Sequence, residues 1–199
     1  MSYATHLEGS IDGSQHDHER LQTLHAGRPL LVRYDLDRVR AEVDRDVFDG
    51  RAGGMWRYRE LLPVREDRNV VSLGEEPTAL VRCCRLADEL GLERLLVKDE
   101  SSLPTGSFKA RGMTLALSRA KELGAVRVGL PTAGNAGGAA AAYAARAGLE
   151  CVVVMPRDTP EVNRLEAELY GARVHVLDGL IDDCGKLVRE HADEWQLFD

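Results

Sequence analysis

The stretch VRVGLPTAGNAGGAAAAYAARAGLECVVVMPRDTPEVNRLEAELYGARVHVL, residues 126–177, decides the fold class. Three short Val-rich runs alternate in it with two longer segments of helical pattern, each of which is followed by a glycine. The runs are residues 126–130, 151–155 and 173–177, and the segments are residues 136–146 and 160–170. The runs show little polar alternation, which is typical of parallel strands covered on both faces. The stretch therefore predicts an α/β fold with a parallel sheet.

Upstream of this stretch the pattern is more irregular. Residues 1–28 are polar, rich in histidine and without period, which predicts a mobile tail. Apolar residues at three- and four-residue steps predict a helix over residues 34–48. A helix at 81–90, a strand at 95–98 and a helix at 113–123 follow. The chain thus divides into a tail (1–28), a mixed segment (29–112) and a regular α/β unit (113–199).

Composition restricts the partners and the compartment. The chain of 199 residues has 26 basic and 33 acidic side chains, a net charge of -7, and no basic cluster that would follow a phosphate backbone, so nucleic acid is not expected as a partner. No apolar run is long enough to span a bilayer and no leader pattern opens the chain, so we expect a cytoplasmic protein without membrane association. Four cysteines without CxxC pairing are expected to be thiols, with Cys151 buried.

The first candidate for chemistry is Lys109 in PTGSFKARG, residues 104–112, a loop at a predicted helix start. An ammonium group desolvated against an apolar wall and near the positive end of a helix has a lower pKa, which frees the amine as a nucleophile. Lys109 is therefore a candidate for imine formation. From local chemistry alone, a solvated lysine at a helix start explains the same residues.

The second candidate is PTAGNAGG, residues 131–138, which follows a predicted strand and opens the Ala-rich helix. Backbone amides at such a position bind anions, and its glycines allow a ligand to approach closely. Thr132 and Asn135 add side-chain hydrogen bonds. A structural strand-to-helix turn with an Asn cap is the alternative, because the spacing matches neither GxGxxG nor GxxxxGK[ST].

Together the two loops resemble those of threonine synthase, a fold-type II enzyme of the tryptophan synthase β-like class that uses pyridoxal 5'-phosphate (PLP). The lead-in segments agree with this resemblance: RYD at 33–35, MWRYRELLPV at 55–64, SLGE at 72–75 and VKDE at 97–100. The likeness extends from Gly27 to the end of the chain. It implies a three-layer parallel-sheet fold, with residues 29–112 as an N-terminal extension and the start of the large PLP domain. Residues 113–199 are then the small, Rossmann-like domain.

The resemblance also implies roles for the two loops. Lys109 would bind PLP covalently and move protons at the substrate's α and β carbons, with Phe108 packed near the cofactor. Asn135 would hydrogen-bond the phenolic oxygen of PLP. The substrate carboxylate would lie on the segment Thr132, Ala133, Gly134, Asn135 and Ala136. The reaction implied is the conversion of O-phospho-L-homoserine and water to threonine and phosphate.

Three departures from the family pattern are visible. Ala79 stands where many relatives have proline, which only loosens a turn. The N-terminal region has scattered histidines in place of a Cys-rich zinc ribbon, so no metal site is expected. The chain stops at Asp199, where the family is about half complete and before its Gly-rich cup for the PLP phosphate. We therefore expect weak or no PLP binding and no turnover by this chain alone, and a homodimer or a complementing C-terminal half as partner.

Two other functions fit parts of this pattern. Serine or threonine dehydratases and related PLP lyases share the lysine and asparagine loops, and the resemblance places the discriminating residues in the later half. A non-catalytic nucleotide-binding or regulatory module would use the same strand and helix rhythm. Against NAD, the strand ending in Met155-Pro156-Arg157 offers no acidic residue for a ribose hydroxyl.

Overall fold

The three Val-rich runs form one parallel sheet in the computed structural model, which describes residues 2–192. The sheet has the order β7 (Arg127–Pro131), β8 (Glu150–Pro156) and β9 (Arg173–Leu177). Its register pairs Val128 with Cys151 and Val153 with Val174. The middle strand is buried from Cys151 to Pro156, as expected of a strand with covered faces. The predicted α/β class with a parallel sheet is confirmed.

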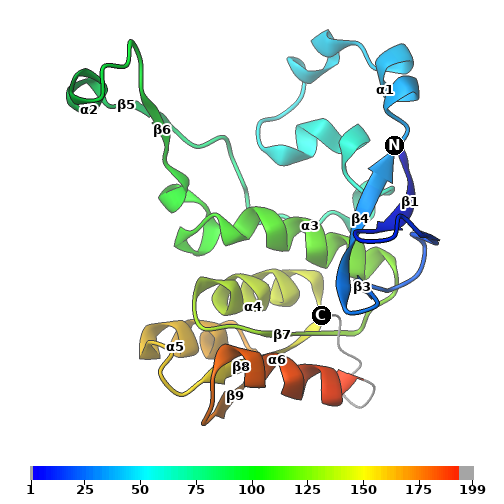
Figure 1. Cartoon of the computed structure of the whole chain (residues 1–199), viewed down its shortest axis with the longest axis vertical. Coiled ribbons are helices and arrows are strands. Elements are labelled where there is room, and N and C mark those ends of the chain that lie inside the picture. The colour runs from blue at the N-terminus through cyan, green and yellow to red at the C-terminus, as the bar shows by residue number, and fades with distance from the viewer. Residues whose placement is uncertain (1, 193–199) are drawn as a thin grey trace.

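Helices cover both faces of this sheet, and a further helix packs on the outside of one of these layers (Figure 1). These helices are α3 (Lys109–Glu122), α4 (Asn135–Ala147), α5 (Glu161–Leu169) and α6 (Ile181–Glu190). Helices α4 and α5 contact each other and cover one face, whereas α6 contacts β7 and β8 from the other. Helix α3 packs on α4 as a further layer. Sequential parallel strands joined by right-handed crossovers place α4 and α5 on the same face.

Small side chains bring these layers close together. Ala139 to Ala142 and Ala144 of α4 are buried, and Tyr143 between them has no exposed surface. Alanines let the α3 and α4 backbones approach, so both helices pack into one apolar core with Val153 and Met155 of β8. Although α4 is rich in alanine, no helix within residues 2–192 is long and apolar enough to cross a membrane.

The N-terminal region differs from the predicted tail. Strands β1 (Ala4–Gly9), β2 (Gln15–His16), β3 (Leu24–His25) and β4 (Arg28–Tyr34) form an antiparallel sheet in the order β2-β1-β4-β3. The hydrogen bonds of a sheet join backbone groups, so a segment rich in polar side chains can still form one. The turns use left-handed backbone at Gly13 and Gly27. Two strands of only two residues carry no readable alternation, which is why the sequence pattern did not reveal this sheet.

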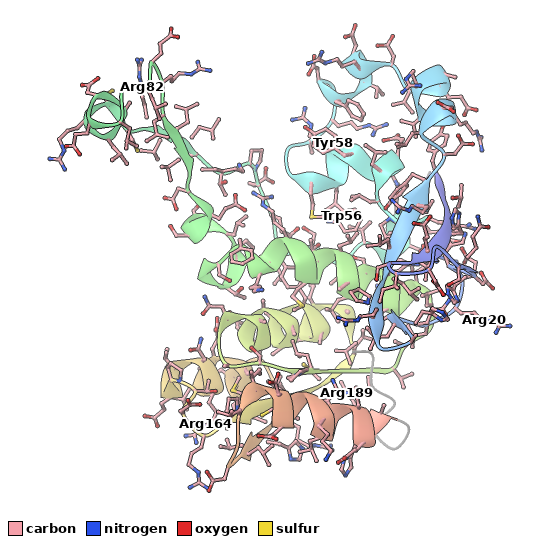
Figure 2. All side chains as sticks on the ribbon, in the orientation of Figure 1. Arg20, Trp56, Tyr58, Arg82, Arg164 and Arg189 are labelled. Carbon is pink, nitrogen blue, oxygen red and sulfur yellow. The ribbon has the colours of Figure 1, made fainter. Side chains whose placement is uncertain are left out.

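A series of short helices connects this sheet to α3. Helix α1 (Leu36–Glu42) ends before the predicted boundary, because Asp44 caps a separate 3-10 helix, η1 (Arg45–Phe48). Two further 3-10 helices follow, η2 (Met55–Leu61) and η3 (Asp67–Asn69). Trp56 points from η2 toward α3 (Figure 2), and its Nε1 donates to Thr114 Oγ1 at 3.0 Å. This bond fixes the connecting segment on the outer side of α3.

Residues 80–98 form an arm that projects from the body (Figure 1). It consists of β5 (Leu80–Arg82), α2 (Cys84–Glu89) and β6 (Leu96–Lys98), with β5 and β6 antiparallel. The predicted helix over 81–90 therefore begins later, because Val81 pairs with Val97 in the hairpin. Leu80 is 62% exposed and Leu90 is 60% exposed, so the arm leaves apolar surface uncovered. Short 3-10 helices η4 (Glu100–Ser102) and η5 (Pro104–Gly106) return the chain to α3.

The reactivity of the cysteines tests whether the middle strand β8 is buried. All four are free thiols; Cys84 is exposed, whereas Cys151 is buried in β8, and burial raises its pKa to about 12. Because the thiolate is the reactive form, we expect iodoacetamide at about pH 8 to modify Cys84 first and to spare Cys151 until the chain unfolds. Mass spectrometry of timed digests measures this order. Equal rates at Cys84 and Cys151 in the folded chain would contradict the buried position of β8.

Candidate active site

The two loops singled out from the sequence lie at the same end of the molecule (Figure 1). Helices α3 and α4 run side by side and begin at this end, where β7 also finishes. The η5 turn that leads into α3 contacts α4. In open parallel sheets, ligands bind outside the carboxyl ends of the strands, at helix starts of this kind. The structure therefore brings the lysine loop, residues 104–112, and the asparagine loop, residues 131–138, to the same end of the molecule.

Lys109 is the first residue of α3 and is half-buried. The helix starts four residues before the predicted boundary at Met113, because Lys109, Ala110 and Arg111 are good helix formers. The preceding turn is tight, with left-handed backbone at Thr105 and Gly106. Lys109 Nζ lies 4.8 Å from the centroid of the Phe108 ring, a cation–π distance. The ring is itself 61% exposed, so it contacts the amine without forming the desolvating apolar wall that the sequence suggested.

Two hydroxyl groups in the turn that precedes Lys109 lack hydrogen-bond partners among residues 2–192. They are Thr105 Oγ1 and Ser107 Oγ, both of which are buried. A buried polar atom without a partner costs about 1–3 kcal/mol, so such atoms usually bond to something. A polar cofactor at the lysine loop would satisfy them. These hydroxyls, together with the amine, fit a group such as PLP that carries several acceptor oxygens.

Thr132 shapes the asparagine loop from inside. It is 5% exposed, its backbone N–H donates to Val154 O at 2.9 Å, and its Oγ1 accepts from Gly134 N at 3.1 Å. The Thr132 hydroxyl and amide are thus engaged within the protein. The amides of Ala133, Asn135 and Ala136 have no hydrogen-bond acceptor in the part of the chain that the structure describes. These three donors are the ones left for an anion.

The glycines of this loop serve two different purposes. A Cβ at Gly134 would meet nothing within 4 Å, so this position is open to a ligand. A Cβ at Gly137 would lie 2.8 Å from Met155 Cε and from Thr132 Cγ2, and one at Gly138 would collide with the Glu166 carboxylate. The sequence suggested that all three glycines admit a ligand. The structure assigns that purpose to Gly134 and assigns helix packing to Gly137 and Gly138.

Asn135 is the first residue of α4, and Gly134 occupies the cap position. The alternative of an Asn cap is therefore not what the structure shows. The Asn135 side chain is exposed, and its Oδ1 accepts from Nδ2 of Asn163 on α5 at 3.1 Å. No acceptor among residues 2–192 takes Asn135 Nδ2. The carboxamide therefore has a free donor at the edge where Lys109 lies.

An ion pair that sequence reasoning did not single out closes the lysine loop. Arg111 donates from Nη2 to Glu100 Oε1 at 2.9 Å and from Nε to Glu100 Oε2. These bonds, followed by one from Thr78, lower the pKa of Glu100 to about 2. Bidentate pairing of this kind fixes geometry as well as charge. The sequence offered one indication of this pair. Glu100 and Arg111 stand on either side of the lysine turn, in the segments VKDE and PTGSFKARG that resemble threonine synthase.

The pH dependence of this pair can be measured. A lowered pKa means that Glu100 stabilises the fold above its ordinary value near 4.5, and that this contribution is lost as the pH falls toward about 2. We expect Glu100→Gln to cost about 1–2 kcal/mol of unfolding free energy at neutral pH. The difference from the parent chain should shrink between those two pH values. Denaturant melts, with the exposed Glu93→Gln as control, check this; a difference that is constant with pH would contradict the pairing.

An apolar hollow lies away from the two candidate residues. A hollow of about 440 Å³ separates the N-terminal sheet from α3 and β7, and is lined by residues such as Leu7, Leu30 and Met113. Neither Lys109 nor Asn135 lines it. No group of three or more His, Cys, Asp or Glu side chains within residues 2–192 could hold a metal ion.

Comparison with known proteins decides the family. Residues 71–198 match the sequence model of the family described as pyridoxal-phosphate dependent enzyme. The chain belongs to this family. A threonine synthase of Methanocaldococcus jannaschii is 41% identical over 181 residues, which cover 90% of this chain and 45% of that protein. A threonine synthase of Synechocystis is 43% identical over 140 residues, or 69% and 37% of the two chains. The resemblance to threonine synthase is confirmed.

The fold agrees with that of solved members of the pyridoxal-phosphate dependent enzymes. Escherichia coli diaminopropionate ammonia lyase superposes with a TM-score of 0.54 at 26% identity, covering 66% of this chain and 43% of the lyase. The predicted fold-type II class is therefore confirmed, as a partial domain. The chain spans less than half the length of the curated relatives it matches. PLP is the cofactor that the family implies, and the two unpartnered hydroxyls, the Lys109 amine and the free amides fit it.

Proposed function

We propose that this chain is the lysine-bearing portion of a threonine synthase-like enzyme, which converts O-phospho-L-homoserine and water to L-threonine and phosphate. The proposal is supported by the side-by-side packing of α3 and α4, which begin with Lys109 and Asn135 at the same end of the molecule. The identity to threonine synthases over both loops supports the reaction class.

The proposed roles follow from the site. PLP, when bound, withdraws electrons from the substrate's α carbon. Lys109 would hold the cofactor through Nζ and then take and return protons at the α and β carbons, with Phe108 beside it. Asn135 Nδ2 would donate to the phenolic oxygen of the cofactor. This donor belongs to the first residue of α4.

The substrate carboxylate is proposed to lie on the α4 start. The free amides of Ala133, Asn135 and Ala136 supply three donors, and open space at Gly134 lets the carboxylate approach. Thr132 contributes by folding this loop through Gly134, and not through a free hydroxyl. This arrangement would orient the amino acid so that its α carbon faces Lys109.

A phosphate-bearing substrate suits the charge near the lysine loop. A hollow of about 290 Å³ is lined by Arg57, Lys98 and Arg111 among others. Arg57 Nε is a buried donor without a partner within residues 2–192. Cations in a recess bind phosphate oxygens, so we place the ester phosphate there. A dehydratase substrate without phosphate would not need this group of charges.

The arm and the apolar hollow suggest what the rest of the enzyme contacts. Both leave apolar side chains uncovered, and isolated two-stranded hairpins are marginally stable in water. We infer that a complementing C-terminal half packs against them, as a continuation of the chain or as a second polypeptide. A homodimer is the alternative partner.

The reaction is tested by joining this chain to the remaining portion of the M. jannaschii relative and assaying two products. Phosphate release from O-phospho-L-homoserine supports the proposal. Ammonia release from threonine without phosphate release would support the dehydratase-like lyase instead. If PLP bound with no turnover of either substrate, a non-catalytic module would be favoured.

A further inference from the structure

We propose that Asn163 is a positioning residue that sets the orientation of the Asn135 carboxamide. Asn163 Nδ2 donates to Asn135 Oδ1 at 3.1 Å, from α5 to the first residue of α4. A carboxamide has its oxygen and its nitrogen on opposite sides. With the oxygen held by Asn163, the Asn135 nitrogen is directed away from α5 as a donor. The inference rests on the proposed function, in which that donor meets the phenolic oxygen of the cofactor.

The position of Asn163 is itself well fixed. Asn163, Glu166 and Ala167 share one face of α5, since residues three and four apart lie above one another on a helix. Ala167 on this face has no exposed surface, and the Glu166 side chain fills the space left by the missing Cβ of Gly138. Burial in this contact raises the pKa of Glu166. Helix α5 therefore cannot rotate relative to α4 without breaking these contacts, and Asn163 remains opposite Asn135.

The orientation matters because the proposed ligand atom only accepts. A phenolate oxygen attracts the NH₂ group of Asn135 and is repelled by its carbonyl oxygen. Without a fixed donor from α5, both orientations of the exposed carboxamide would be populated. Asn163 selects the productive orientation before the cofactor arrives, which reduces the ordering required on binding.

Three substitutions separate the donor role of Asn163 from its size. Asn163→Asp can only accept, so it should draw the Asn135 NH₂ group toward α5 and reverse the carboxamide. Asn163→Ala removes the bond and leaves no preference. Asn163→Lys can only donate, so it should preserve the parent orientation. Thermal unfolding of all variants confirms that each is folded.

The first measurement requires no cofactor. The complete 199-residue chain contains three asparagines, Asn69, Asn135 and Asn163, so isotope labelling of asparagine gives three side-chain amide pairs that single substitutions assign. We expect the Asn135 NH₂ protons to exchange freely with water in the parent, Ala and Lys chains, and to be protected in the Asp chain. Protection of these protons in the parent that disappears in the Ala chain would show Asn135 as the donor to α5. That result overturns the proposal.

The second measurement adds PLP and follows the same signals. The apparent Kd should rise about threefold in Asn163→Ala, about tenfold or more in Asn163→Asp, and little in Asn163→Lys. Equal affinities in all four chains would overturn the positioning role. A parent Asn135 signal that does not move with PLP, while the exchange pattern is as expected, would refute the proposed cofactor contact and leave the orientation by Asn163 established.

Discussion

Borohydride reduction of the chain in the presence of PLP is expected to attach the pyridoxyl group to Lys109 ahead of every other lysine. The chain contains four lysines, Lys98, Lys109, Lys121 and Lys186, so peptide mapping resolves them all. Reduction is irreversible and accumulates product even when binding is weak. Lys109 has an aromatic ring beside its amine and the free donors of the α4 start at the same edge, so PLP should reside there longest.

Substitution at the two ends of α3 provides the control. Lys109→Ala should reduce labelling to the level of the exposed lysines, a loss of about tenfold or more, because only random collisions remain. Lys121→Ala removes a lysine from the last turn of the same helix and should leave Lys109 labelling intact. Uniform labelling of the four lysines in the parent chain would contradict the assignment of Lys109.

The affinity for PLP is expected to depend strongly on the remaining portion of the enzyme. We expect the 199-residue chain alone to bind PLP much more weakly than the same chain joined to the remaining portion of a relative. Charge-assisted hydrogen bonds to a phosphate contribute about 1.5–3 kcal/mol each. If the joined portion supplies two such bonds to the PLP phosphate, the chain without them should have a Kd higher by roughly a hundredfold to ten-thousandfold. The free donors identified at the α4 start number three, and the proposed substrate carboxylate competes for them. Titration followed by visible absorbance measures both affinities.

A chain whose lysine loop is intact but whose asparagine loop is altered is the appropriate control. Asn135→Leu keeps Lys109 and removes the free donor, so it should weaken both forms by a similar factor. A tight, stoichiometric absorbance band with the unmodified 199-residue chain would show that this chain already holds the phosphate. PLP binding would then not require a complementing C-terminal half.

The parallel sheet was predictable because its signals are local. Valine runs, glycines at helix ends and the lengths of the intervening segments fix β7, β8 and β9 to within a residue or two. The burial of Cys151 followed from its place in the middle strand. Here local propensity and tertiary packing favour the same structure, so pattern reading is sufficient.

The N-terminal half was less predictable because its structure depends on pairing between distant residues. Leu7 lies opposite Val32, and Val81 lies opposite Val97, so neither strand is specified by its own segment. Single positions also redirected the chain, as Asp44 did by capping a 3-10 helix where one longer helix was expected. A local capping bond there outweighs the helical period.

The sequence predicted which loops form the site, but not the hydrogen bonds that position their residues. Lys109 and Asn135 were identified from their motifs, and the structure places both at helix starts on one edge. Arg111 bonds to Glu100 across the lysine loop, and Asn163 donates to Asn135; no spacing rule in the sequence predicts either contact. Such contacts depend on how helices pack, so only coordinates reveal them.

The roles of Lys109 and Asn135 are tested most directly by a crystal structure of the chain after reduction with PLP, which locks the cofactor in place despite weak affinity. We expect electron density continuous with Lys109 Nζ, with the phenolic oxygen within hydrogen-bond distance of Asn135 Nδ2. Density attached to Lys98, Lys121 or Lys186, or a pyridoxyl group at Lys109 that points away from the α4 start, would contradict these roles.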